Sequence, residues 1–191
     1  MNLPSTPSFS LKNKRALITG ASSGIGLACA VALAEYGASI TIAARRSQKL
    51  EELSASLKDK GISTELVELD VSKTDRTLQT INRLDPFDIL VNSAGIAKHS
   101  LSVETKEADF DDVMSVNLKG AYFLTMAVAR RLILANKIGS LINISSQMGL
   151  VGGQERAVYS ASKHAVEGFT KSIAIEFCLL YTSPSPRDIP L

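Results

Sequence analysis

The chain has 191 residues, of which 45% are hydrophobic and 21% charged, an ordinary composition for one globular domain with a sizeable core. Its 21 Lys and Arg residues against 19 Asp and Glu give a net charge of +2, too balanced to indicate a nucleic-acid or membrane surface. The two cysteines form no C-x-x-C pair and require no disulfide, which suits a reducing cytosol, so a cytoplasmic location is expected.

Residues 1–8 lack the charged and apolar regions of a signal peptide, and we expect them to form a flexible leader. No apolar run reaches the length of a membrane helix. The sequence predicts no metal site.

The first predicted elements are a buried strand at Ala16–Thr19, a glycine-rich turn and an alanine-rich helix. Such a junction favours an anion, because the first N–H groups of the helix have no internal partner and its positive dipole end faces the turn. Gly20, Gly24 and Gly26 fit a loop that approaches a pyrophosphate closely, although a tight turn without a ligand is the alternative. The missing Gly-Lys-Ser/Thr disfavours ATP or GTP.

Ser39–Ala44 is the second predicted strand and completes a β-α-β unit. NAD-binding proteins place an acid here for the ribose 2′-hydroxyl, whereas this chain has Ala44 followed by Arg45 and Arg46. Two guanidinium groups without a carboxylate suit a 2′-phosphate, so NADP(H) is favoured over NAD(H). The alternative is that both arginines only solvate the next helix.

The middle of the chain alternates predicted helices with strands. An amphipathic helix at Gln48–Lys60 precedes a strand at Glu65–Val71. Asp70 at the end of that strand either accepts from an adenine amino group or caps the next turn. A helix at Thr74–Leu84 then leads to a strand at Asp88–Val91.

Small residues follow that strand at positions 92–95 and would let the chain pass close to a cofactor. Helical spacing at Val103–Met114 predicts a helix that continues through Ala121–Leu134. Asn117 lies inside it and is a poor mid-helix residue, for which a tolerated surface position is the simplest explanation from the residue alone.

A fifth strand at Ser140–Ser145 precedes a loop and a last helix at Tyr159–Glu176. Tyr159 and Lys163 share one face of this helix, about 5–6 Å apart at Cβ. A free phenol has a pKa of about 10, and a neighbouring ammonium or a positive nicotinamide ring favours the phenolate and makes a phenol a better acid–base catalyst. Ser146 could donate to a substrate oxygen as charge develops there. Taken without the other motifs, the spacing of Tyr159 and Lys163 fits equally well two solvent-exposed side chains with no catalytic role.

Taken in order, these motifs resemble the short-chain dehydrogenase/reductase family. The match comprises T-G-x-x-x-G-x-G at 19–26, N-S-A-G at 92–95, Asn117, Ser146 and Tyr-x-x-x-Lys, within residues 9–177. By resemblance the catalytic residues are Asn117, Ser146, Tyr159 and Lys163. The cofactor-binding residues implied are Gly20, Ser22, Ser23, Gly24, Ile25, Gly26, Arg45, Arg46, Asp70, Val71, Asn92, Ala94, Gly95, Tyr159 and Lys163.

The resemblance implies a role for each catalytic residue. Tyr159 is the general acid/base, Ser146 orients the carbonyl, and Lys163 assists Tyr159 and holds the ribose. Asn117 kinks its helix and anchors a proton-relay water, so it need not be a surface residue. Ser146 is preferred over Ser145 because of the family's Ser-to-Tyr spacing, and His99 matches no catalytic position.

The family also implies the fold: a Rossmann-like, doubly wound parallel α/β sheet in three αβα layers. Here the match stops near Phe177, and residues 178–191 contain three prolines and no helix or strand pattern, which indicates a non-native tail. We therefore expect an incomplete domain that lacks the last strands, with an unpaired edge on the fifth strand and poor stability or activity. Ser93 replaces the Asn that the family usually has.

The predicted function is an NADP(H)-dependent oxidoreductase that interconverts a ketone and a secondary alcohol. The chain looks most similar to 3-oxoacyl-carrier-protein reductases and gluconate-type dehydrogenases. Alternatives are an inactive fragment and a non-catalytic dinucleotide-binding protein, although the latter usually loses the Tyr or the Lys. The family implies a small-molecule partner and a homodimer or homotetramer of the parent protein, with the helices at 112–134 and 159–176 as the dimer face.

Overall fold

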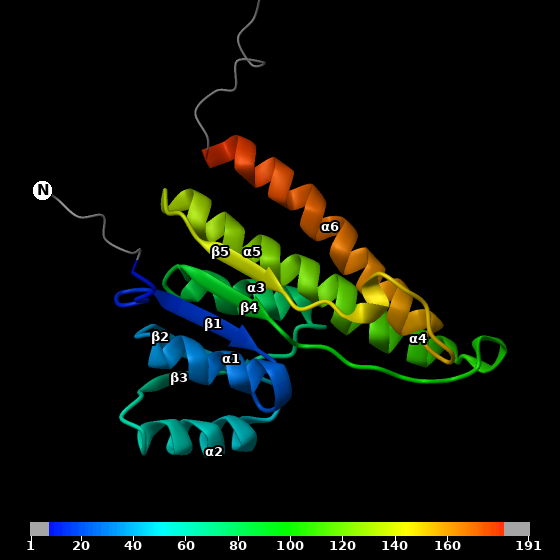
Figure 1. The fold of residues 1–191 in the computed structure, drawn as a ribbon, viewed down its shortest axis with the longest axis horizontal. Coiled ribbons are helices and arrows are strands. Elements are labelled where there is room, and N and C mark those ends of the chain that lie inside the picture. Colours follow the sequence, from blue (N-terminus) through cyan, green and yellow to red (C-terminus); the bar gives the residue numbers. More distant parts are fainter. Residues whose placement is uncertain (1–7, 182–191) are drawn as a thin grey trace, which may run out of the picture.

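The computed structural model describes residues 8–181, which fold around one sheet of five parallel strands. The strand order is β3-β2-β1-β4-β5, so the sheet is wound outward in both directions from β1 (Figure 1). The strands are β1 (Arg15–Thr19), β2 (Ser39–Ala44), β3 (Thr64–Glu68), β4 (Ile89–Asn92) and β5 (Ser140–Asn143). In this winding all strands end at one edge, where a ligand crevice is expected.

Side chains of β1 alternate between two hydrophobic cores, one on each face of the sheet. Leu17 packs with residues of α3 (Thr74–Arg83) and α5 (Ala121–Leu134). Ala16 and Ile18 pack on the other face, with residues of α1 (Gly24–Glu35) and α2 (Ser47–Lys58). Because both faces are covered, the three central residues of the strand are all apolar rather than alternating with polar residues. The three αβα layers predicted from the sequence are confirmed.

The remaining helices lie beyond the carboxyl edge and beside β5 (Figure 1). They are η1 (Ser102–Glu104), α4 (Glu107–Met114), η2 (Ser115–Gly120), η3 (Gln147–Gly149) and α6 (Ala157–Tyr181). Segment η2 is π-helical and joins α4 to α5, so the predicted long helix is continuous but locally distorted at Asn117. Such π-bulges are frequent at functional sites.

Several element boundaries differ from the sequence predictions, and two of the differences bear on predicted site or tail residues. Strand β3 ends at Glu68, which leaves Asp70 in the loop that follows rather than in the strand. Helix α6 continues to Tyr181. The prediction that no helix follows Phe177 was therefore wrong for residues 178–181, the first four residues of the predicted tail. The leader residues 1–7 and the tail residues 182–191 lie outside the described part of the chain.

Strand β5 lies at the edge of the sheet, as expected from the sequence: no strand within residues 8–181 pairs with its outer side. An apolar groove of about 400 Å³ borders this edge and is lined by residues of α5, β5 and α6. Ile142 of β5 is 43% exposed. Among residues 8–181, no helix is both long enough and apolar enough to cross a bilayer.

Candidate active site

A cavity of about 410 Å³ lies at the carboxyl ends of β1, β2 and β4. Its walls come from the loops that follow all five strands, together with Val116 and the start of α6, which are far apart in sequence but meet at the same sheet edge. The lining residues that the sequence predicted are Gly20, Ser22, Ser23, Ile25, Arg45, Arg46, Asp70, Val71, Ala94, Gly95, Tyr159 and Lys163. The parallel topology therefore brings the glycine turn, the arginine pair and the Tyr–Lys pair to one place.

The glycine turn between β1 and α1 is closed by contacts within the protein itself. A Cβ on Gly20 would lie 2.9 Å from backbone atoms of Ser93 and Ala94, and Gly20 has φ +64°. A Cβ on Gly26 would lie 2.5 Å from the Gly20 carbonyl oxygen. The tight packing of these two glycines is against their own chain, whereas Gly24 has φ +57° and nothing within 4 Å of its Cβ position. Of the three glycines, Gly20 lines the cavity, whereas Gly24 and Gly26 do not.

The start of α1 has the properties of an anion site. Ser23 is the N-cap residue but makes no side-chain capping bond, and the first turn contains no acidic residue. The first N–H groups of a helix need an acceptor from outside it. A pyrophosphate at this position would satisfy these donors and meet the positive end of the helix dipole. The residues present thus fit a dinucleotide.

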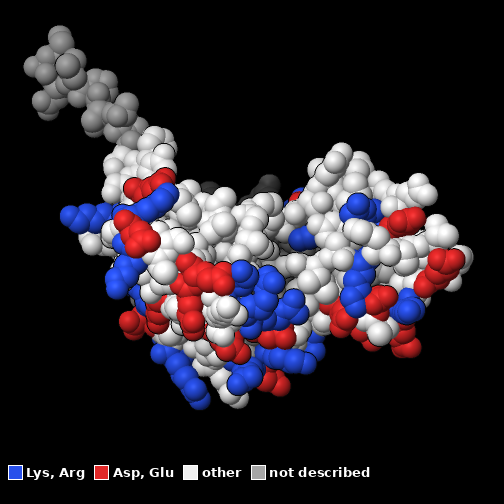
Figure 2. All heavy atoms as spheres, turned by 90° about the horizontal axis from the view of Figure 1, so that it is seen from below, with Lys and Arg blue, Asp and Glu red and all other residues white. Residues whose placement is uncertain are grey.

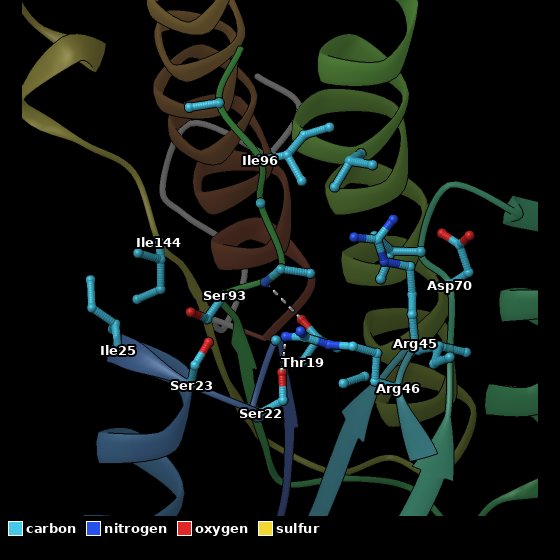
Figure 3. Close-up of a pocket in the computed structure, with 18 of the residues that line it drawn as sticks. Thr19, Ser22, Ser23, Ile25, Arg45, Arg46, Asp70, Ser93, Ile96 and Ile144 are labelled. Atoms are coloured by element: carbon cyan, nitrogen blue, oxygen red, sulfur yellow. Dashed lines mark hydrogen bonds between the residues drawn. The ribbon is translucent and has the colours of Figure 1, made fainter. Parts of the chain in front are cut away.

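Arg45 and Arg46 extend the cavity at the end of β2. Arg46 Nη2 lies 3.5 Å from Ser22 Oγ, so this side chain reaches back to the glycine turn (Figure 3). Arg45 lies on the side of the cavity where Asp70 is found (Figure 3). Basic side chains gather beside a hollow on the face seen from below (Figure 2). Because Asp70 is the single acid among the lining residues, the cavity has an excess of positive charge.

Asp70 caps the turn that follows it, which is one of the two roles predicted from the sequence. Its Oδ1 accepts from the Ser72 N–H at 3.0 Å and from Ser72 Oγ at 2.7 Å. Asp70 also lines the cavity, next to Val71. Its second carboxylate oxygen is left for a ligand such as an adenine amino group, so the two predicted roles are compatible.

Asn92 is buried beneath the cavity rather than exposed in its wall. Thr19 Oγ1 donates to Asn92 Oδ1 at 3.0 Å and accepts from the Ala94 N–H at 3.3 Å. Asn92 Nδ2 donates to the Ala121 carbonyl at 3.0 Å and to Asn143 Oδ1 at 3.3 Å. Asn92 therefore ties the ends of three strands to α5. Asn143 was not predicted as part of this network, and the available signal was a polar residue within an otherwise apolar strand segment.

Asn117 is buried, with 1% of its surface exposed. Its side-chain amide forms hydrogen bonds with the backbone N–H and carbonyl of Ile96, as a neighbouring strand would. Its Oδ1 accepts from the Ile96 N–H and its Nδ2 donates to the Ile96 carbonyl, both at 2.8 Å. Nδ2 also donates to Ser162 Oγ at 3.1 Å. A surface position for Asn117 was thus wrong. Asn117 instead fixes the loop after β4 against α6.

Tyr159 and Lys163 both line the cavity from the first turns of α6. Lys163 Nζ lies 5.8 Å from the centre of the Tyr159 ring and donates to the Ile144 carbonyl at 2.7 Å. A Cβ on Gly95 would be 3.8 Å from Lys163 Nζ and 3.4 Å from Asn117 Oδ1, so Gly95 packs directly beside these two groups. Burial lowers the pKa of Lys163 below its usual value, because the charged form loses water.

The two adjacent serines after β5 occupy different environments. Ser146 Oγ accepts from the Met148 N–H at 3.1 Å and caps η3, and Ser146 is absent from the cavity lining. Ser145 does line the cavity, and its Oγ is buried without a hydrogen-bond partner. The Gly149 Cβ position would be 2.6 Å from Ser145 Oγ, which shows that this hydroxyl packs against the η3 turn.

Comparison with known proteins identifies similar sequences over most of the chain. Residues 14–178 match the short chain dehydrogenase family. Gluconate 5-dehydrogenase from Gluconobacter oxydans is 35% identical over 173 residues, which cover 88% of this chain and 67% of that protein. A 3-oxoacyl-acyl-carrier-protein reductase from Rickettsia bellii is 36% identical over 166 residues, covering 87% of this chain and 67% of the reductase. The chain spans about two thirds of the length of these relatives.

A solved structure shows the same arrangement of elements. Gluconate 5-dehydrogenase from Burkholderia cenocepacia, in complex with NADP and tartrate, superposes with a TM-score of 0.85 at 34% identity. The match covers 90% of this chain and 68% of that protein. At this level of identity the likeness extends beyond the fold to sequence.

Proposed function

Because the chain belongs to the short-chain dehydrogenase family, we propose that it is an NADP(H)-dependent oxidoreductase that interconverts a ketone and a secondary alcohol. One observation supports this most strongly: Tyr159 and Lys163 line the same cavity as the glycine turn and the arginine pair. A non-catalytic dinucleotide-binding protein would need only the turn and the arginines.

The cofactor is a nicotinamide dinucleotide, as for the NADP-bound gluconate 5-dehydrogenase structure. We assign its pyrophosphate to the start of α1, where N–H groups, Ser22 and Ser23 face the cavity. Arg45 and Arg46 would hold a 2′-phosphate by charge-assisted hydrogen bonds, which supports NADP(H) over NAD(H). Asp70 and Val71 border the place for adenine. When bound, the cofactor supplies or accepts the hydride.

The protein's own contribution is to position the substrate and to move a proton. Tyr159 donates the proton to a carbonyl oxygen, or removes it from an alcohol, as general acid/base. The Lys163 ammonium beside the Tyr159 ring stabilises the phenolate form and can donate to a ribose hydroxyl. Ser146 orients the carbonyl by donating to its oxygen. Asn117 keeps the loop after β4 in place, and a water near it would complete the proton relay.

Two reaction types follow from the relatives' names. Oxidation of a hydroxyl on a sugar acid corresponds to gluconate 5-dehydrogenase, and reduction of a 3-oxoacyl thioester corresponds to the carrier-protein reductase. Both are interconversions of a ketone and a secondary alcohol and use the same proton and hydride transfers. The proposed partner is therefore a small carbonyl or alcohol compound, and the proposed compartment is the cytoplasm.

A homodimer or homotetramer is proposed for the parent protein. Tyr122 of α5 forms edge-to-face contacts with Phe123 and with Phe169 of α6, at centroid distances of 5.4 and 5.5 Å. Tyr122 and Phe123 remain 37% and 39% exposed. These partly exposed rings on α5 and α6 support the predicted dimer face.

The Tyr159→Phe variant tests the function directly. Removing the hydroxyl should leave most of the NADPH affinity, measured by cofactor fluorescence, because the pyrophosphate and the 2′-phosphate are assigned to the start of α1 and to the arginine pair. Turnover should fall by about 10²–10⁴-fold with any substrate that the unmodified chain accepts from a panel of sugar acids and 3-oxoacyl thioesters. A variant that keeps full turnover would exclude Tyr159 as the acid/base. Loss of NADPH binding as well would indicate a structural role.

A further inference from the structure

Two basic side chains meet between two loops that each contribute other residues to the cavity lining, although neither of the two side chains lines the cavity itself. His99 lies in the loop after β4, and Arg156 immediately precedes α6. Arg156 Nη1 and His99 Nε2 are 3.0 Å apart. Both loops leave the same edge of the sheet and run side by side (Figure 1). This contact, between residues 57 positions apart, was not expected, because His99 matched no catalytic position.

The direction of this hydrogen bond leaves donors exposed on both partners. A guanidinium can only donate, so His99 Nε2 accepts and the imidazole is neutral with its proton on Nδ1. The pair then presents the remaining N–H groups of Arg156 together with the Nδ1–H of His99. An arrangement of donors without acceptors is suited to an anion.

Two carboxylates near His99, those of Asp109 and Asp112, are engaged by Lys98. Lys98, the residue before His99, is bound by Asp109 and Asp112 at 2.6 Å each. These hydrogen bonds raise the pKa of Lys98 and lower that of Asp112, so the ammonium offsets one of the two negative charges and the cluster keeps one excess negative charge. Within the described residues, no carboxylate lies within ion-pair distance of Arg156. The half-buried guanidinium thus lacks a counter-ion.

The backbone on both sides of the pair is held in place. His99 lies between Lys98, which is fixed to α4, and Ser100, whose Oγ is 3.0 Å from Thr105 Oγ1. Glu155, directly before Arg156, has φ +58°, a conformation that non-glycine residues rarely adopt. Strain of this kind is often found at ligand sites. The donors are therefore presented from fixed positions, which lowers the entropic cost of binding an anion.

The pair is close to the reacting groups. The Ser160 N–H donates to the Arg156 carbonyl at 2.7 Å, so Arg156 begins the first helical turn of α6. Residues three apart on a helix are neighbours on its surface, which places Arg156 beside Tyr159. Ile96 and Ala97, just before His99 in the same loop, line the cavity.

We propose that Arg156 and His99 bind the carboxylate of the substrate, which makes the chain selective for hydroxy acids and keto acids. This inference rests on the proposed function and names its substrate class. Arg156 holds the carboxylate as a fork, and His99 both orients the guanidinium and donates from Nδ1. The reacting carbon of the substrate lies within a few bonds of that carboxylate, because Arg156 and Tyr159 are one helical turn apart.

The experiment is a calorimetric titration of the full chain with hydroxy acids of four to six carbons and their primary amides. An acid and its amide have nearly the same shape but differ in charge. We expect at least one acid to bind tenfold or more tightly than its amide. Arg156→Met should weaken the acid tenfold or more and leave the amide unchanged, and Arg156→Lys should recover part of the difference. Titrations with and without NADP⁺ separate this result from a failure of cofactor binding.

Arg83→Met is the matched control, since it removes the same charge from the exposed end of α3, at the opposite edge of the sheet. It should leave the binding of both acid and amide unchanged. Equal affinity for acids and amides in the unmodified chain would overturn the proposal, as would equal weakening of both by Arg156→Met. Thermal melting shows whether each variant is folded. Failure of the proposed function would appear separately, as absent NADPH binding or absent hydride transfer.

Discussion

At the scale of single residues, Arg45 and Arg46 lie together at the end of β2 but have different surroundings. Arg46 contacts Ser22 in the glycine turn, whereas Arg45 lies toward Asp70 (Figure 3). A guanidinium bound to a phosphate contributes a charge-assisted hydrogen bond of about 1.5–3 kcal/mol. NADPH carries a 2′-phosphate and NADH does not, so this hydrogen bond should contribute to the binding of NADPH only.

We predict that Arg45→Ala weakens NADPH binding by about 10–100-fold, the equivalent of that hydrogen bond, and changes NADH binding much less. Fluorescence titration with both cofactors measures the two dissociation constants. Arg83→Ala, far from the cavity, should change neither. Equal losses for NADPH and NADH would show that Arg45 does not bind the 2′-phosphate.

Ser145 and Ser146 provide a second prediction, since the structure places Ser145 in the cavity lining and engages Ser146 Oγ with the Met148 N–H. If Ser146 orients the carbonyl, Ser146→Ala should lower kcat by about 10²–10³-fold, as expected for the loss of one donor to a developing oxyanion. Ser145→Ala should lower kcat less than Ser146→Ala, because it removes a buried hydroxyl that has no partner. The reverse order of kcat values would assign the role to Ser145.

At the scale of elements, the π-helical segment η2 connects α4 to α5 and carries Asn117 into the interior. The sequence predicted a helix here, and helical spacing cannot distinguish an α-helix from a short π-helical stretch. The three side-chain bonds of Asn117 hold the Ile96 backbone and Ser162. This segment therefore fixes both the loop after β4 and the start of α6.

We predict that Asn117→Leu destabilises the protein by about 3 kcal/mol or more, because the Ile96 N–H and carbonyl would be buried without partners. Thermal unfolding measures this change, and NADPH titration measures the accompanying loss of cofactor affinity. Lys119→Met, at an exposed position of the same segment, is the control and should leave both nearly unchanged. Unaltered unfolding of Asn117→Leu would show that these bonds contribute little.

At the scale of the whole molecule, the sheet has an uncharged edge at β5, next to an apolar groove. Natural sheets usually protect such an edge by charges or by covering it. Ile138 is 80% exposed beside β5, and Ile142 within it is 43% exposed. We therefore expect molecules of this chain to associate with one another through the exposed edge of β5.

Sedimentation velocity over a range of concentrations tests this expectation. The unmodified chain should associate increasingly with concentration, and Ile142→Lys should reduce that association, because a charge on an edge strand opposes pairing. Val103→Lys, at a 94% exposed position in η1, adds the same charge away from the edge and should have no effect. Association that is equal in all three chains would place the contact elsewhere.

The sequence by itself determined the order of helices and strands, the glycine turn and the Tyr159–Lys163 pair. These features are local: periodicity, turn chemistry and a spacing of four residues fix them within one or two elements. Only the tertiary structure showed that Asn117 is buried against Ile96, that Gly20 and Gly26 pack against their own chain, and that Arg156 meets His99. Those facts depend on contacts between distant segments, and a pattern of residue types along the chain does not contain them.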